Sequence, residues 1–215
     1  MGMNDLFWMK EAFALALRAQ EQGEVPVGAI LVDEANQMLG RGWNQVLQAH
    51  DPTAHAEILA LREAGMKTQN YRLQNTTLYV TLEPCCMCAG ALVHARIKRL
   101  VFATRDFRVG AAGSVFNLLQ GASLNHQVQI DEGVLQHECA SLLVDFFKTE
   151  WSKIHNDFIF HRNYLLHQYR FIMTAPGKGE DKLRTPIVQE LISALGPYVD
   201  VELIHYWGNV NALNL

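Results

Sequence analysis

The stretch Pro84-Cys85-Cys86-Met87-Cys88, together with the earlier stretch His55-Ala56-Glu57, is the part of this sequence that best predicts its fold and its chemistry. One histidine and two cysteines supply three metal ligands, and a glutamate lies beside them. A structural zinc site is normally closed by four protein ligands, whereas a catalytic site keeps three and leaves the fourth position for water. The two stretches therefore predict a catalytic zinc site.

Helix geometry selects which two cysteines bind the metal. Pro84 is typical of the first turn of a helix, and residues three apart on a helix share a face. Cys85 and Cys88 are the one such pair in this stretch. The partial positive charge at a helix N-terminus also favours the thiolate form that binds metal. We therefore expect Cys85 and Cys88 to join His55 as ligands, and Cys86 to be a packing residue.

Glu57 is the residue expected to make this metal site catalytic. Two thiolates formally cancel the charge of zinc, so its bound water is less acidic than in an all-histidine site and needs a nearby base. A carboxylate two residues beyond His55 can approach that water without taking a coordination position. It can then carry the proton to a leaving group, so we expect Glu57 to act as both base and acid.

Composition favours a globular intracellular protein. The chain has 215 residues, of which 49% are hydrophobic and 19% charged, so it can bury one sizeable core and a small appendage. No apolar run approaches the ~20 residues of a membrane span, and the N-terminus lacks the pattern of a signal peptide. Four cysteines, three of them between 85 and 88, suit a metal site in a reducing compartment better than disulfides. We therefore expect a cytoplasmic location.

The net charge of −4 does not by itself indicate nucleic-acid binding. A local basic cluster between 96 and 108, broken by the single acid Asp106, would nevertheless serve as an RNA contact. An ordinary solvated face is the alternative. The cluster consists of Arg96, Lys98, Arg99, Arg105 and Arg108.

Hydrophobic periodicity predicts alternating helices and strands. Helices are expected at 4–22, 53–64, 85–95 and 133–153, and strands at 25–32, 38–44, 76–81, 99–103 and 128–130. Thr53 is a candidate N-cap for the second helix and Gly65 its end, which places His55 and Glu57 in the first turn. The strand, helix, strand order predicts a three-layer α/β sandwich.

The order H-x-E and then P-C-x-x-C is the signature of zinc-dependent nucleobase deaminases. Within that group the chain closely resembles the bacterial tRNA-specific adenosine deaminases, from about Leu6 to Phe147. The shared stretches are EVPVGA at 24–29, GWN at 42–44, DPTAHAEI at 51–58, NYRL at 70–73, TLEPC at 81–85 and GAAGS at 110–114.

This resemblance implies the cytidine deaminase-like fold, a three-layer α/β/α sandwich with a mixed five-stranded sheet. It also implies zinc as cofactor and hydrolytic deamination of adenosine to inosine at the wobble position of a tRNA anticodon, usually in an arginine tRNA. In such an enzyme zinc activates a water for attack on the base, and Glu57 moves the protons. Family members are homodimers, and the expected partner is the anticodon stem-loop.

The resemblance further implies residues that contact the substrate. Asn44, the backbone around Ala56, and an apolar wall matching Val25 and Leu82 are expected to hold the flipped adenine. From the residues alone, Asn44 could simply hydrogen-bond its own turn, and Leu82 would be ordinary core.

Asp106 is implied to face a ribose, where a carboxylate can accept a hydrogen bond from the 2′-hydroxyl that separates RNA from DNA. A turn-capping role for this aspartate is the alternative. Phe107 is a possible stacking platform for a base. We interpret Glu83, which precedes the cysteine stretch, as structural.

Two other functions have to be weighed. The zinc motifs are shared with deaminases of free bases such as guanine or cytosine, but the region of Asn44 and the loop 106–114 argue against that class. An RNA-binding module that keeps zinc only for shape is the second alternative, and the intact Glu57 argues against it.

We expect residues 1–153 to form the deaminase domain and residues 154–215 a C-terminal α/β extension of unknown fold. The extension departs from the family pattern, with an expected loop at 175–182, a helix from Thr185 to Leu195 and a strand at 199–205. Its many apolar residues indicate that it is folded. It could extend the RNA surface or merely stabilise the protein. The basic residues that would contribute are Lys148, Lys153, Arg162 and Arg170.

Overall fold

The structure is a computed structural model that describes residues 4–121, 123–162, 171–176 and 201–206. The chain forms two compact units, Met1–Glu150 and Trp151–Leu215. The expected domain boundary after residue 153 lies close to this division. Each unit is described by itself.

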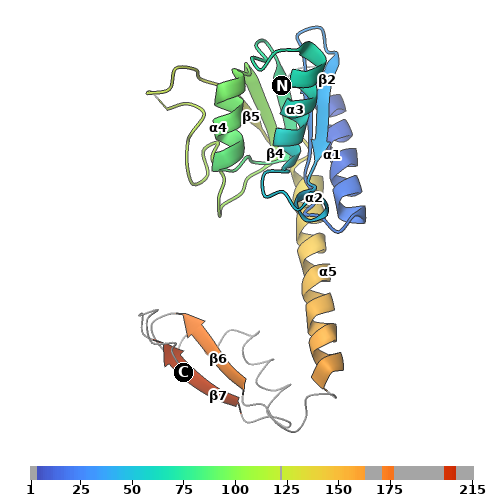
Figure 1. Ribbon diagram of the computed structural model, residues 1–215, viewed down its shortest axis with the longest axis vertical. Coiled ribbons are helices and arrows are strands. Elements are labelled where there is room, and N and C mark those ends of the chain that lie inside the picture. Colours follow the sequence, from blue (N-terminus) through green and yellow to red (C-terminus); the bar gives the residue numbers. More distant parts are fainter. Residues whose placement is uncertain (1–3, 122, 163–170, 177–200, 207–215) are drawn as a thin grey trace. The chain divides into compact units, whose positions relative to one another are not determined.

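The first unit contains a mixed five-stranded sheet, as the resemblance implied (Figure 1). The strand order is β2-β1-β3-β4-β5, in which β1 is antiparallel to β2 and β3 while β3, β4 and β5 are parallel. The strands are β1 (Gly28–Val32), β2 (Met38–Trp43), β3 (Thr77–Leu82), β4 (Arg99–Thr104) and β5 (Gln129–Glu132).

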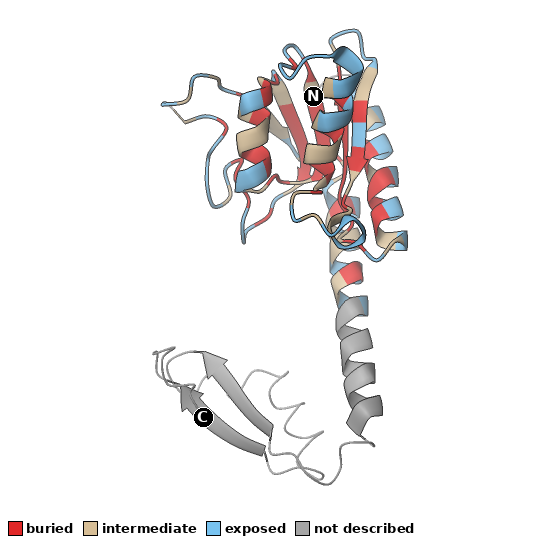
Figure 2. Cartoon of the chain, viewed as in Figure 1, coloured by how far each residue is buried: buried red, intermediate tan, exposed pale blue. Residues whose placement is uncertain are grey.

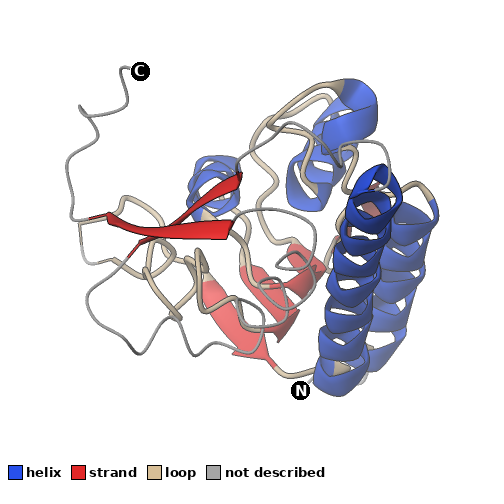
Figure 3. Ribbon diagram, turned by 90° about the horizontal axis from the view of Figure 1, so that it is seen from below, coloured by secondary structure: helices blue, strands red, loops and turns tan. Residues whose placement is uncertain are grey.

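Helices cover both faces of the sheet, which confirms the three-layer sandwich (Figures 1 and 3). Successive strand residues point to opposite faces, so Ala29 and Leu31 of β1 join one core while Ile30 and Val32 join the other. The first core contains α3 (Ala56–Thr68) and α4 (Cys86–Ala95), and the second contains α1 (Asp5–Glu21) and the start of α5 (Gln136–Arg162). The central strands are therefore buried on both sides (Figure 2).

Glycines in β2 let helix α3 lie directly on the strand. A Cβ atom at Gly42 would overlap the carbonyl oxygen of Ala56 and the backbone nitrogen of Ala60, and Gly40 stands in the same relation to the next turn of the helix. This close approach sets the N-terminus of α3 beside the end of β2, where Asn44 follows.

The predicted ends of α3 are wrong at both termini. The N-cap is His55 and not Thr53, because the hydroxyl and the amide of Thr53 are both hydrogen-bonded to Asp51 in the preceding turn. The helix also continues past Gly65 to Thr68, because the left-handed conformation that ends it is adopted by Gln69. His55 is therefore at the mouth of the helix, while Glu57 is in the first turn as expected.

Several other elements differ from the prediction. A short helix, α2 (Val46–Ala49), was not predicted, and α5 runs beyond residue 153 to Arg162. In the second unit, β6 (Phe171–Pro176) pairs in parallel with β7 (Val201–Tyr206). The strand β7 corresponds to the strand expected at 199–205, whereas β6 was not predicted. The expected helix from Thr185 to Leu195 and nearly all of the loop 175–182 lie outside the described residues.

None of the helices in the described segments is both long enough and apolar enough to cross a lipid bilayer.

Candidate active site

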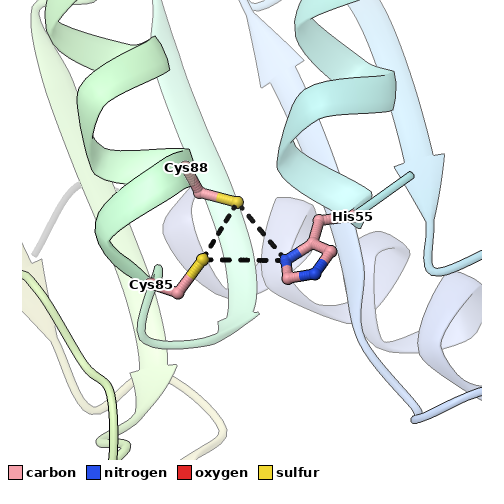
Figure 4. A group of neighbouring side chains, drawn as sticks. All are labelled: His55, Cys85 and Cys88. Carbon is pink, nitrogen blue, oxygen red and sulfur yellow. Dashed lines mark hydrogen bonds between the residues drawn. The ribbon is translucent and has the colours of Figure 1, made fainter. Parts of the chain in front are cut away.

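Three side chains meet where helices α3 and α4 begin (Figure 4). His55 is the N-cap of α3, Cys85 is the N-cap of α4, and Cys88 is in the first turn of α4. The Nδ1 atom of His55 lies 3.8 Å from Sγ of Cys85 and 3.5 Å from Sγ of Cys88, and the two sulfur atoms are 3.7 Å apart. Within the described residues, this is the one group of histidine, cysteine and acidic side chains with such a geometry.

These distances fit zinc. Zinc–sulfur bonds of about 2.3 Å and zinc–nitrogen bonds of about 2.0–2.1 Å in a tetrahedron place two sulfurs roughly 3.8 Å apart and a sulfur and a nitrogen roughly 3.6 Å apart. Each separation in the cluster is within about 0.2 Å of those values. The cluster can therefore hold a zinc ion with little rearrangement, and with three protein ligands one position is left for water.

The other cysteines lie outside the cluster. Cys86 is exposed, so the expectation that it packs in the protein is wrong. It follows the N-cap by one residue, and on a helix that position faces away from the Cys85 and Cys88 side. Cys139 is a free thiol buried in the core.

Electrostatics already favour one thiolate in the cluster. Hydrogen bonding with Cys88 lowers the pKa of the Cys85 thiol to about 4, and the same contact raises the pKa of Cys88. Cys85 is thus favoured as the thiolate, which is the form of cysteine that binds a metal ion.

Glu57 lies beside the cluster without belonging to it. Its side chain is 4% exposed and lines the same cavity as His55 and Cys85. Burial raises the pKa of the Glu57 carboxyl, and this outweighs the opposing effect of His55. A carboxyl group in such surroundings can exist in both protonation states during a reaction.

The cavity of about 480 Å³ collects most of the predicted site residues. Its lining includes Val25, Asn44, Leu82 and Asp106 in addition to His55, Glu57 and Cys85. A larger hollow of about 860 Å³ lies between α3 and α4 and contains none of these residues. The cavity that has the metal cluster at its wall is therefore the candidate active site, although it is the smaller of the two.

Asn44 connects this cavity to helix α3. Its Oδ1 atom accepts a hydrogen bond of 3.0 Å from the backbone N–H of Ala56. Among the residues that the structure describes, Nδ2 of Asn44 has no hydrogen-bond partner, and the side chain faces the cavity. Asn44 can thus donate to a bound molecule while its oxygen holds the first turn of the helix.

Asp106 is 8% exposed and also lines the cavity. Its Oδ1 atom accepts a hydrogen bond of 2.9 Å from the N–H of Arg108. This is the turn-capping contact that the sequence left open, and it leaves Oδ2 available. Phe107 is 78% exposed and does not line the cavity.

The predicted basic cluster does not form one continuous free patch. Arg99 is partly buried and pairs with Asp5 and Asp131, and Arg105 pairs with Glu132. Arg108 is exposed at the rim of the cavity.

Part of the cavity wall could not be found from sequence. Phe146 and Phe147 of α5 line it, although their spacing in the sequence indicated only an apolar helix face. Leu47 of the unpredicted helix α2 also lines it, and Glu24 accepts hydrogen bonds from the backbone of that helix. Glu24 is the first residue of the shared stretch EVPVGA, and that position is the signal that could have indicated it.

Comparison with known proteins places this site in a family. Residues 3–104 match the cytidine and deoxycytidylate deaminase zinc-binding region. The chain is 53% identical over 140 residues to the tRNA-specific adenosine deaminase of Haemophilus influenzae, covering 65% of this chain and 81% of that protein. It is 43% identical over 157 residues to the tRNA-specific adenosine deaminase of Aquifex aeolicus, covering 73% of this chain and 100% of that protein.

Solved structures of related deaminases are similar to this chain in fold. A structure from work on A-to-I editing by tRNA:A34 deaminases at the wobble position aligns with a TM-score of 0.62 at 37% identity, covering 64% of this chain and 99% of that chain. A guanine deaminase from Nitrosomonas europaea aligns with a TM-score of 0.58 at 23% identity, covering 66% of this chain and 83% of that chain, which shows a shared fold. Both zinc motifs lie within the matched region, and the relatives match over most of their own length, so the chain belongs to the bacterial tRNA-specific adenosine deaminases, zinc-binding hydrolases of the cytidine and deoxycytidylate deaminase family.

Proposed function

We propose that this protein converts adenosine to inosine at the wobble position of a tRNA anticodon, with an arginine tRNA as its substrate. The observation that carries the proposal is a single cavity that joins the metal cluster, the buried carboxylate of Glu57 and the free amide of Asn44. The names of the relatives in Haemophilus influenzae and Aquifex aeolicus support tRNA adenosine as the substrate class.

The reaction adds water at C6 of adenine and breaks the bond from C6 to the exocyclic nitrogen, releasing ammonia. When bound to His55, Cys85 and Cys88, zinc supplies an acidified water. Glu57 carries one proton of that water to the ring nitrogen N1, and it then carries the second proton, from the hydroxyl added at C6, to the departing amine. Its burial keeps bulk water from competing for that proton.

The base is held by groups on two sides of the cavity. Asn44 donates from Nδ2 to a ring nitrogen, and Val25 and Leu82 provide apolar contact with the faces of the ring. The N–H of Ala56 is already used by Asn44, so in this proposal Ala56 acts by orienting that side chain.

The nucleotide outside the cavity is selected by Asp106. Its Oδ2 atom accepts a hydrogen bond from a ribose 2′-hydroxyl, which DNA lacks. An anticodon loop is already single-stranded, so the adenosine can leave its neighbours at a small cost.

We also propose that the protein acts in the cytoplasm as a homodimer bound to an anticodon stem-loop. Exposed apolar side chains in the segment 107–118 support an association surface near the cavity. They are Phe107, Val109, Val115, Phe116 and Leu118.

The test is to incubate the zinc-loaded protein separately with an anticodon stem-loop that has adenine at the wobble position, with free guanine, with adenosine and with cytidine. Inosine and ammonia from the stem-loop alone are the expected result. Ammonia from guanine, adenosine or cytidine would instead assign the protein to the deaminases of free bases and nucleosides. Binding of the stem-loop without any product would indicate an RNA-binding module. Stem-loops with other anticodons test the preference for an arginine tRNA.

A further inference from the structure

Glu83 is a buried acid, 3% exposed, in the segment between β3 and α4. Its two oxygen atoms accept hydrogen bonds from the loop that follows β4. Oε2 accepts from the N–H of Asp106 at 3.0 Å and from the hydroxyl of Ser114, while Oε1 accepts from the N–H groups of Ala112 at 2.9 Å and Ser114 at 3.0 Å. One carboxylate thus holds both ends of the loop 106–114.

The contacts of Glu83 are unlike those of an ordinary surface acid. In the described part of the chain it forms no salt bridge, and its oxygen atoms accept hydrogen bonds from three backbone N–H groups and one hydroxyl. The loop also lies very close to it, because a Cβ atom at Gly110 would overlap the Glu83 carboxylate and the carbonyl oxygen of Asp106. The N–H of Gly110 in turn donates to that carbonyl at 2.9 Å. The position of Asp106 is therefore determined by Glu83 and Gly110 together.

We infer that Glu83 is a positioning residue for substrate selection: it fixes Asp106 at the cavity wall, and through Asp106 it sets the preference for ribose over deoxyribose. This inference rests on the proposed function, in which Asp106 accepts from a 2′-hydroxyl.

The variant Glu83→Gln should lose one particular contact. A carboxylate accepts hydrogen bonds at both oxygens, whereas an amide has one acceptor oxygen and one donor NH₂ group. The NH₂ group of glutamine must therefore lie against hydrogen-bond donors of the loop. If the oxygen stays with the N–H groups of Ala112 and Ser114, the hydroxyl of Ser114 can rotate and accept. The N–H of Asp106 then has no acceptor. The opposite orientation would leave two backbone N–H groups unpaired, so it is less favourable.

Glu24 offers a matched control. It is also a buried glutamate, 2% exposed, and its Oε1 atom accepts from the N–H groups of Leu47 and Gln48 on another wall of the cavity. Glu24→Gln makes the same chemical change at similar burial but leaves the loop 106–114 in place.

The experiment compares wild type, Glu83→Gln, Glu24→Gln, Asp106→Asn and the double variant Glu83→Gln/Asp106→Asn. The two readouts are the ratio of kcat/KM for RNA and DNA hairpins of the same sequence and the hydrogen exchange of the Asp106 amide. We expect Glu83→Gln to lower the RNA preference roughly tenfold, the size of one lost buried hydrogen bond, and to speed exchange of the Asp106 amide. Glu24→Gln should keep the RNA preference, and the double variant should lose no more preference than Asp106→Asn alone.

The outcomes separate this inference from the proposed function. If wild type shows no RNA preference, the proposed role of Asp106 fails, and the exchange measurement still decides whether Glu83 fixes the loop. If Asp106→Asn loses the preference but Glu83→Gln keeps it, with unchanged exchange, the positioning role is overturned. Should Glu83→Gln not fold, Ser114→Ala removes one donor only and should change both readouts in the same direction, and no change in either would overturn the inference.

Discussion

His55, Cys85 and Cys88 come from the first residues of two helices, and Glu57 lies in the first turn of α3 but outside the cluster. Helix N-termini favour anionic ligands, and residues at the start of a helix are fixed by the whole element behind them. A metal ion at this cluster would be held by side chains at the starts of two helices, and the carboxylate beside it would stay free for proton transfer.

We predict that Cys88→Ala loses zinc while Cys86→Ala retains it. Cys88 is buried in the cluster, and Cys86 is exposed on another side of the same helix. Metal content of the two purified variants, measured alongside wild type, checks this. Equal zinc loss in both would contradict the ligand assignment.

Glu57→Gln should abolish deamination of the stem-loop while zinc content and RNA affinity stay close to wild type. Glutamine keeps the shape of the side chain but cannot move a proton, and such a loss typically costs ~10²–10⁴ in rate. Single-turnover kinetics with a zinc assay on the same preparation measure both properties. Turnover near the wild-type rate would contradict the mechanism.

Helix α3 can orient the site because it lies against β2 without intervening side chains. Gly42 faces the backbone of Ala56 and Ala60, and Asn44 accepts from the first free N–H of the helix. Because the two backbones are in direct contact, helix α3 can occupy only one position along β2.

We therefore predict that Gly42→Ala destabilises the protein by about 1–3 kcal/mol, the usual cost of overpacking. Gly90→Ala is the control, because Gly90 is inside α4 and a Cβ atom there has no neighbour within 4 Å. Alanine at Gly90 should be neutral or should stabilise by up to about 1 kcal/mol from helix propensity. Denaturant unfolding of both variants gives the comparison, and a similar effect of the two would refute the packing argument.

Long-range ion pairs join the layers of the first unit. Arg99 of β4 contacts Asp5 of α1 at 2.8 Å and Asp131 of β5 at 2.6 Å, and the hydroxyl of Tyr79 donates to Asp5 at 2.9 Å. Burial and the contact with Asp5 raise the pKa of Tyr79 to about 12. The first unit therefore has its own core and its own polar connections between helix and sheet.

The C-terminal extension is proposed to widen the RNA surface, with stabilisation as the alternative. Truncation at Ile154 removes the whole extension, including Arg162 and Arg170, and it shortens helix α5, which runs to Arg162. If the extension binds RNA, the truncated protein should keep its zinc but bind tRNA more weakly with a shallower salt dependence, because fewer phosphates are neutralised. Unchanged affinity and slope with a lower Tm would favour stabilisation.

The sequence by itself determined the order of helices and strands in the first unit apart from the short helix α2, the sandwich architecture and the identity of the clustered metal ligands. These follow from local rules: the periods of helix and strand, and the three-residue spacing of Cys85 and Cys88 on one helix face. Even there, the N-cap of α3 was misplaced, because Thr53 satisfies Asp51 and not the helix.

Only the tertiary structure decided which residues far apart in the chain contact one another around the site. No local sequence pattern indicates that Arg99 pairs with Asp5 or that Phe147 lines the cavity. The same is true of the hydrogen bonds from the loop 106–114 to Glu83. Each of these contacts joins segments far apart in the chain. The sequence around a glutamate looks the same whether its carboxylate is exposed to water or, like that of Glu83, accepts from four donors. Burial and convergence of backbone N–H groups exist only once the sheet has brought those segments together.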